Sequence, residues 1–145
     1  MEIERKFLIP ELPADLSGYP HKELEQAYLC TSPVVRVRKE DDTYYLTCNG
    51  KGMMVREEYT LPLTKEAYQH LLEKADGKII TKTRYLIPLA PYTIELDIFH
   101  ADYEGLYLAE VEFPDKKAAE QFTPPSWFGE DVTFDGRYHN SAMSV

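Results

Sequence analysis

The chain has 145 residues, of which 43% are hydrophobic and 28% are charged, and its formal net charge is −9. A chain of this length can bury a core without disulfides or a structural metal. The spacing of Cys30 and Cys48 matches no metal or redox motif, so both are expected to be free thiols. The negative charge argues against nonspecific binding to nucleic acid, so an anionic ligand would be held by a local basic cluster or through cations.

No apolar stretch of the sequence approaches the length of a membrane span. Charged residues follow Met1 at once, where a signal peptide would not place them. The protein is therefore expected to be cytoplasmic, with no membrane or nucleic-acid partner.

Alternation of polar and apolar residues, interrupted by turn residues, predicts about eight strands. They are expected, in chain order, at residues 2–9, 24–30, 34–40, 43–48, 54–61, 79–87, 93–99 and 106–113. Apolar residues at helical spacing predict a helix from the cap Thr64 to about Ala75, with Gly77 as its C-terminal stop. A short helix is expected at 115–122, and the tail, 124–145, is expected to be irregular with one helical turn.

Charged residues recur two positions apart in most of these strands. Because residues two apart lie on the same face of a strand, each of these strands presents a charged face and a largely apolar one. The charged sets are Glu2, Glu4 and Lys6; Arg36 and Arg38; Arg56 and Glu58; Lys82 and Arg84; Glu95 and Asp97; and Glu110 and Glu112.

An open antiparallel sheet with one solvated face would also produce this alternation. Against that alternative, nearly every polar-face position is Arg, Lys, Glu or Asp, and pairs such as Glu110 and Glu112 have no base between them on the same face. Two unit charges ~4 Å apart interact with roughly 4 kcal/mol at an effective dielectric constant of ~20. Such crowding destabilises a sheet unless cations neutralise it.

Closing the sheet turns the charged face inward and leaves the apolar face outside, where helices can cover it. We therefore predict a mainly β fold, an eight-stranded antiparallel β-barrel or tunnel with a few peripheral helices, in a single domain over residues 1–145. Clusters of carboxylates suit Mg²⁺ or Mn²⁺, and the basic side chains suit phosphate oxygens. A metal-bridged polyanion such as a triphosphate satisfies both.

The opening segment, Glu2-Ile-Glu4-Arg-Lys6, resembles the ExExK motif of the CYTH superfamily, also called triphosphate tunnel metalloenzymes. The charged sets of the later strands follow in the order found in that family, and the tail adds Asp131-Val-Thr133 and Tyr138-His-Asn140. The resemblance covers essentially the whole chain, whose size is similar to that of the compact bacterial inorganic tripolyphosphatases.

The resemblance implies a metal-dependent triphosphatase that uses Mg²⁺ or Mn²⁺ to hydrolyse inorganic triphosphate inside the tunnel. It assigns substrate binding to Lys6, Arg36, Arg38, Arg56, Lys82 and Arg84. It assigns metal binding to Glu2, Glu4, Glu58, Asp97, Glu110 and Glu112. The residues implied to act in catalysis are Lys6, Arg56, Glu58 and Lys82. In similar proteins the C-terminal segment plugs one tunnel mouth, which would place residues 138–142 where they limit substrate length.

Two positions depart from the family pattern. Similar proteins often have Thr-x-Lys where this chain has Thr47-Cys-Asn49, with Lys51 two residues further on, and another inward glutamate where it has Thr60. The alternatives are therefore a class IV adenylyl cyclase, a thiamine or nucleoside triphosphatase, or a polyphosphate- or nucleotide-binding module with weak catalysis. Both a monomer and a homodimer fit the sequence.

Overall fold

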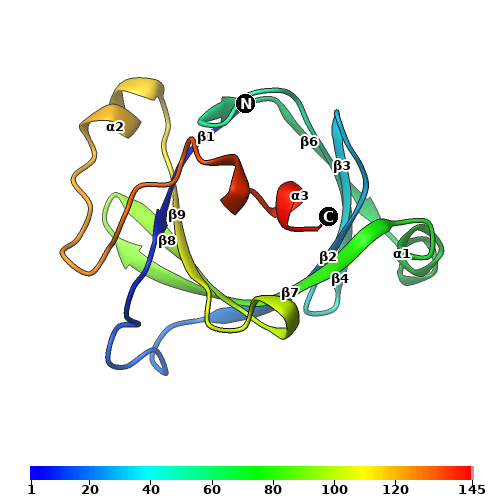
Figure 1. Cartoon of the computed structure of the whole chain (residues 1–145), viewed down its shortest axis with the longest axis horizontal. Coiled ribbons are helices and arrows are strands. Elements are labelled where there is room, and N and C mark those ends of the chain that lie inside the picture. The colour runs from blue at the N-terminus through cyan, green and yellow to red at the C-terminus, as the bar shows by residue number, and fades with distance from the viewer. Residues whose placement is uncertain (145) are drawn as a thin grey trace.

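An antiparallel sheet rolled into a nearly closed barrel dominates the computed structural model, which describes residues 1–144 (Figure 1). The order of the strands around the barrel is β5-β1-β9-β8-β7-β2-β3-β4-β6. The strands are β1 (Glu2–Leu8), β2 (His21–Thr31), β3 (Val34–Glu40), β4 (Thr43–Asn49), β5 (Val55–Arg56), β6 (Glu58–Leu63), β7 (Asp76–Leu89), β8 (Tyr92–Phe99) and β9 (Tyr107–Glu112). The predicted antiparallel barrel is confirmed.

The barrel closes where one predicted strand divides into two. The strand expected at 54–61 forms β5, which pairs with β1, and β6, which pairs with β4. Glu57 lies between them, so the two outermost strands of the sheet are consecutive in the chain. Residues 1–144 therefore form nine strands rather than the eight expected, and these strands still form the predicted antiparallel barrel.

The helices are short and lie mostly outside the barrel. They are α1 (Lys65–Leu72), α2 (Lys116–Gln121) and α3 (Asn140–Met143), with 3₁₀ turns η1 (Ala101–Tyr103) and η2 (Gly136–Tyr138). The predicted cap of α1 is present, because the Ala67 backbone N–H donates to Thr64 Oγ1 over 3.1 Å. The predicted stop is wrong: α1 ends at Leu72, and Gly77, with a φ of 71°, is the second residue of β7. Glycine is favoured at any position with a positive φ, in a strand as well as at a helix end. The presence of Gly77 therefore did not locate the end of α1.

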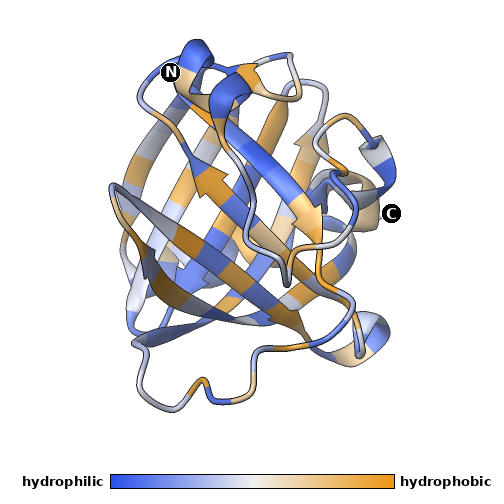
Figure 2. Ribbon diagram, turned by 90° about the vertical axis from the view of Figure 1, so that its left-hand side faces the viewer, coloured by the Kyte–Doolittle hydropathy of each residue, from blue (hydrophilic) through white to orange (hydrophobic). Residues whose placement is uncertain are grey.

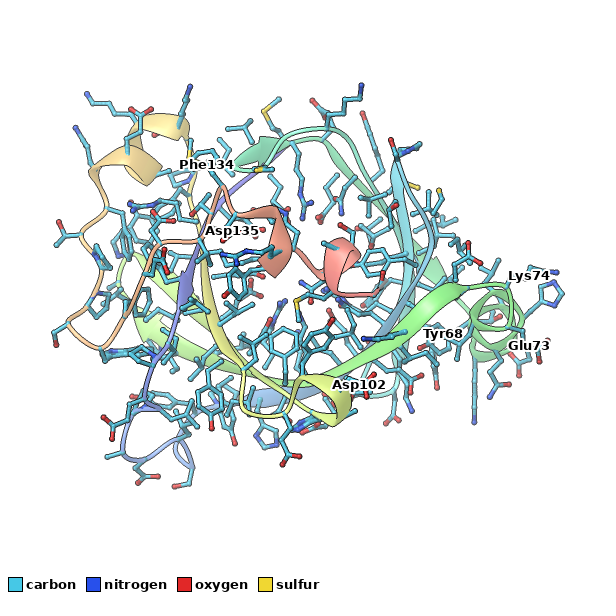
Figure 3. All side chains as sticks on the ribbon, in the orientation of Figure 1. Tyr68, Glu73, Lys74, Asp102, Phe134 and Asp135 are labelled. Carbon is cyan, nitrogen blue, oxygen red and sulfur yellow. The ribbon has the colours of Figure 1, made fainter. Side chains whose placement is uncertain are left out.

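The outward face of the strands is apolar, and peripheral segments cover much of it. Alternate residues along the strands differ sharply in hydropathy (Figure 2). Helix α1 packs on one side, where buried Tyr68 meets Ala27 and Val37, and the Tyr68 hydroxyl donates to Glu25 Oε1 over 2.7 Å. Figure 3 shows Tyr68 on the side of α1 that faces the barrel wall. Apolar burial on this outer face leaves part of the interior to polar side chains.

A second outer cluster lies on β8 and β9. Leu96, Ala109 and Val111 are fully buried there, and residues from the loop after β1, from α2 and from the segment that follows it pack against them. Apolar burial on this side supports the two strands that carry Glu95, Asp97, Glu110 and Glu112.

The tail enters one end of the barrel instead of lying on its surface. In Figure 1 the segment from η2 to α3 lies within the ring of strands. There Met143 packs with Tyr28, Ile80 and Phe99 in an interior apolar cluster. The Tyr103 hydroxyl donates to the Met143 carbonyl over 2.6 Å. This end of the barrel is thus filled by side chains. Among the described residues, no helix is both long and apolar enough to cross a membrane.

Replacing Leu96 by Ala should lower the free energy of unfolding by about 2–5 kcal/mol, because Leu96 is 0% exposed and the surrounding strands cannot collapse onto the space. Urea denaturation measures this change. Leu61→Ala is the matched control, since Leu61 is 59% exposed and should change stability by no more than about 0.5 kcal/mol. Equal losses in the two variants would contradict the assigned packing.

Candidate functional site

The inward faces of the strands enclose a cavity of about 210 Å³ whose walls are almost entirely polar. Side chains from strands all around the ring project into this interior (Figure 3). Its basic side chains are Lys6, Arg36, Arg38, Arg56 and Arg84, and its carboxylates are Glu2, Glu4, Glu40, Glu58, Glu95, Glu110 and Glu112. The neutral lining residues are Tyr28, Val34, Asn49, His139, Asn140 and Ser141.

Strand pairing determines which charges become neighbours. Glu110 on β9 lies between Lys6 on β1 and Glu95 on β8 in the register of the sheet. Lys6 Nζ lies 3.4 Å from Glu110 Oε1 and donates to the Tyr138 carbonyl over 3.0 Å. Two residues along the same pair of strands, Glu4 on β1 lies opposite Glu112 on β9. The register therefore places a base beside Glu110 and a second acid beside Glu112.

A buried ion cluster lies beneath the cavity. Arg84 donates from Nε to Asp97 Oδ1 over 2.7 Å and from its terminal nitrogen to Oδ2 over 2.9 Å, and Lys82 Nζ lies 2.8 Å from the same carboxylate. Although burial alone would raise it, Arg84 and Lys82 hold the pKa of Asp97 below its usual value. Burial lowers the pKa of Lys82 to about 8, against the opposing attraction of Asp97. Lys82 also donates to Asn140 Oδ1 of the tail over 3.3 Å.

Two further arginines are held by partners on neighbouring strands. Arg56 Nε donates to Glu2 Oε1 over 3.1 Å. Arg38 Nε donates to the side-chain oxygen of buried Gln26 over 2.8 Å. Burial lowers the pKa of Arg38 to about 10, with a contribution from the other arginines of the cavity. These guanidinium groups are oriented before any ligand arrives.

The carboxylates at the other side of the cavity repel one another. Burial, followed by the charges of Glu110 and Glu2, raises the pKa of Glu4 well above its usual value. Burial and Glu2 also raise the pKa of Glu58 to about 7 and, in the same direction, that of Glu112. By contrast Lys6 and Arg84 outweigh burial and lower the pKa of Glu110. Crowded, incompletely neutralised oxygen donors are the chemistry that hard divalent cations fit. Within residues 1–144, no three His, Cys, Asp or Glu side chains already converge as metal ligands.

The structure brings most of the sequence-predicted site residues to the wall of one cavity. The exceptions are Lys82 and Asp97, which have the inward parity but lie below the cavity in the ion cluster. Sequence reasoning did not select Glu40 or Tyr28. Glu40 continues the spacing of Arg36 and Arg38 and could have been found from it, whereas Tyr28 is neutral and no charge pattern marks it. The tail was expected at a tunnel mouth over residues 138–142, and residues 139–141 of that segment line the cavity.

The two positions that depart from the family pattern differ in their surroundings. Asn49 is buried and lines the cavity. Lys51 is exposed in the turn after β4 and lines a neighbouring recess of about 470 Å³. Thr60 is exposed, with its hydroxyl 3.4 Å from that of Thr47. Lys51 therefore does not replace a lysine inside the cavity.

Comparison with known proteins identifies the family of the chain and relatives of similar fold. A family profile described as the CYTH domain matches residues 1–139. A protein of Nitrosomonas europaea named inorganic triphosphatase is 38% identical to this chain, and the match covers 99% of this chain and 97% of that protein. An inorganic triphosphatase of Acetivibrio thermocellus is 35% identical over 98% of this chain and 92% of its own length. The crystal structure of an inorganic triphosphatase superposes with a TM-score of 0.72 at 36% identity, covering 99% of this chain and 94% of that one.

Replacing Glu58 by Gln should stabilise the protein in a pH-dependent way. Because the folded-state pKa of about 7 exceeds the ordinary value of 4.5, the folded state holds the Glu58 proton more tightly than the unfolded state does. The stability contributed by that proton is present below pH 4.5 and lost as the pH rises to about 7. The melting temperature of Glu58→Gln minus that of the wild type should therefore increase across this window and level off above it.

Differential scanning fluorimetry between pH 4.5 and 8.5 measures the difference. The control is Glu57→Gln, one residue away on the exposed surface, for which the difference should stay flat. A Glu58→Gln difference that is the same at both ends of the range would contradict the assigned environment of Glu58.

Proposed function

Because the chain belongs to the CYTH domain family, we propose that it is a metal-dependent hydrolase of inorganic triphosphate that works inside the barrel. The observation that carries this proposal is the polar cavity of about 210 Å³, in which basic side chains and crowded carboxylates share one enclosed space. Such a space suits a compact polyanion accompanied by cations. The naming of two relatives at 35–38% identity as inorganic triphosphatases supports the same substrate.

In this proposal, five basic side chains bind the triphosphate oxygens. They are Lys6, Arg36, Arg38, Arg56 and Arg84. Arginine suits this role because its planar guanidinium can donate two parallel hydrogen bonds to one phosphoryl group. Lys82, which the sequence suggested as a substrate ligand, is fully buried and bound to Asp97. We assign it to holding Asp97, which in turn orients the guanidinium of Arg84.

The carboxylates of Glu2, Glu4, Glu58 and Glu112 would hold one or two Mg²⁺ or Mn²⁺ ions. All four line the cavity, and the pKa values of the last three are raised, which indicates that negative charge there lacks a counterion. When bound, the ions would neutralise phosphoryl charge and acidify water. Asp97 is a poor candidate for this set, because both of its oxygens are already engaged by Arg84 and Lys82.

The reaction requires little of the protein beyond positioning and charge neutralisation. Phosphoryl transfer to water needs an in-line attack and stabilisation of the charge that spreads over the equatorial oxygens. Three arginines of the cavity, Arg38, Arg56 and Arg84, are pre-oriented by neighbouring side chains. Pre-oriented donors need no reorganisation as the reaction proceeds, which favours the transition state.

One observation favours a second candidate, an organic triphosphatase. The recess beside the cavity has largely apolar walls that include Pro33, Val34 and Met53, and it shares Asn49 and Arg56 with the cavity. An organic group attached to a triphosphate could occupy it. Phosphate release from tripolyphosphate, pyrophosphate, ATP and thiamine triphosphate, each with Mg²⁺, with Mn²⁺ and with chelator, separates the candidates.

The proposal expects tripolyphosphate with a divalent cation to be the preferred substrate and chelator to stop the reaction. Preferred turnover of an organic triphosphate would replace it with the second candidate. Formation of cyclic AMP from ATP would instead indicate an adenylyl cyclase. Binding without turnover under every metal would indicate a polyphosphate-binding module.

Glu112→Gln should lower metal-dependent hydrolysis by roughly 100-fold or more, because a neutral amide is a poor ligand for a hard cation. Lys6→Ala should instead raise the KM for tripolyphosphate by roughly 10-fold, with a smaller effect on kcat, because it removes a charge that binds the substrate. Steady-state phosphate release measures both effects. Glu73→Gln and Lys74→Ala are the matched controls, since both residues lie beside α1 outside the barrel (Figure 3). Full activity in the first two variants would remove Glu112 and Lys6 from the site.

A further inference from the structure

Among the residues that the structure describes, one basic side chain of the cavity lacks a carboxylate partner. Lys6, Arg38, Arg56 and Arg84 each lie within 4.0 Å of a carboxylate oxygen. Arg36 is the exception within residues 1–144: it takes part in no ion pair, and its Nε is buried without a hydrogen-bond partner. A guanidinium left unpaired in a low-dielectric interior is an expensive arrangement unless a ligand completes it.

The side-chain amide of Asn49 is also buried without a hydrogen-bond partner within residues 1–144. Asn49 is 2% exposed, and both its amide nitrogen and its amide oxygen are buried without a partner among the described residues. Its cross-strand neighbour on β6 is Glu58, yet no hydrogen bond joins the two side chains. Almost all buried polar groups in folded proteins are hydrogen-bonded, so an amide with no partner on either atom requires an explanation.

The two unpaired groups lie on the same stretch of wall. Asn49 pairs with Val34, and Thr47 pairs with Arg36, in the register of β3 and β4. Arg36 and Asn49 are therefore diagonal neighbours on the inward face. In an antiparallel pair, the backbones of such neighbours lie about 7 Å apart. Both line the charged cavity. Two side chains so placed can donate to different oxygens of one tetrahedral group.

We propose that Asn49 contacts the substrate directly and forms with Arg36 a binding subsite for one phosphoryl group on the wall made by β3 and β4. The inference rests on the proposed function. Arg36 donates N–H groups to one phosphoryl oxygen, and Asn49 Nδ2 donates to another. Asn49 Oδ1 accepts from a protonated phosphoryl oxygen or from a water bound to it.

A neutral amide at this position differs from the lysine that similar proteins often carry there. Lysine only donates and adds a charge, whereas an amide both donates and accepts and leaves the charge of the cavity unchanged. The subsite thus recognises the pattern of hydrogen bonds on a phosphoryl group more than its charge, while Arg36 supplies the charge.

Asn49→Leu tests the inference because it removes the amide and keeps a side chain of similar shape. If the amide is reserved for substrate, its loss should raise the melting temperature of the ligand-free protein by about 2–6 °C, because a buried group without partners is removed. The same change should lower kcat/KM for tripolyphosphate with Mg²⁺ by about 10- to 100-fold. An amide with a merely structural role would give a lower melting temperature and unchanged kinetics.

Two further variants sharpen the test. Asn49→Asp replaces the donors with a negative charge and should lower kcat/KM more than Asn49→Leu does. Arg36→Met combined with Asn49→Leu should cost less than the product of the two single losses, because both side chains bind the same phosphoryl group. A loss equal to that product would contradict a shared subsite. The control is Cys48→Ala, on the opposite face of the same strand, which should keep both quantities close to those of the wild type.

The outcomes separate the inference from the proposed function. A wild-type protein that neither binds nor hydrolyses tripolyphosphate would overturn both. An active wild type with an Asn49→Leu variant of equal kcat/KM would overturn only the subsite. If the wild type binds tripolyphosphate without turnover, the increase in melting temperature that tripolyphosphate produces takes the place of kcat/KM. That increase should be smaller in Asn49→Leu, and an equal increase would overturn the subsite.

Discussion

The carboxylate of Asp97 provides the interaction on which the interior of this barrel depends. It is fully buried and lies within 2.8 Å of both Lys82 Nζ and Arg84 Nε. Removing one member of such a cluster leaves an uncompensated buried charge, which typically costs about 3–5 kcal/mol. Because Asp97 satisfies two cations, it fixes the guanidinium of Arg84, which also reaches Glu95 over 3.1 Å. Charge is thus neutralised in the ion cluster and left unbalanced among the carboxylates that line the cavity.

That division explains how one small barrel can be both stable and reactive. The apolar outer face, covered by α1, α2 and the loop after β1, stabilises the strands without using the interior. The tail fills one end with apolar side chains such as Met143. The remaining interior can then hold carboxylates such as Glu4 and Glu112, whose pKa values are raised by burial and by neighbouring carboxylates.

Much of this arrangement could be predicted from the sequence, because the period of two that defines a strand also defines its faces. That period placed Arg36, Arg56 and Glu110 in one interior. Depth along the barrel could not be predicted, because it depends on the stagger between strands, which no local pattern encodes. Lys82 therefore had the same pattern as the cavity residues while lying below them. The sequence likewise could not predict that the buried amide of Asn49 has no hydrogen-bond partner within residues 1–144.

The position of β1 has a consequence for how the molecule folds. β1 pairs with β5 and β9, and Lys6 donates to the carbonyl of Tyr138, 132 residues away in the chain. Contacts of such long range form late, because the chain must lose much loop entropy before they can be made. During synthesis, the three charged side chains that β1 contributes to the cavity emerge before those of β9, with which β1 pairs. The charged interior can therefore assemble only after β9 has left the ribosome.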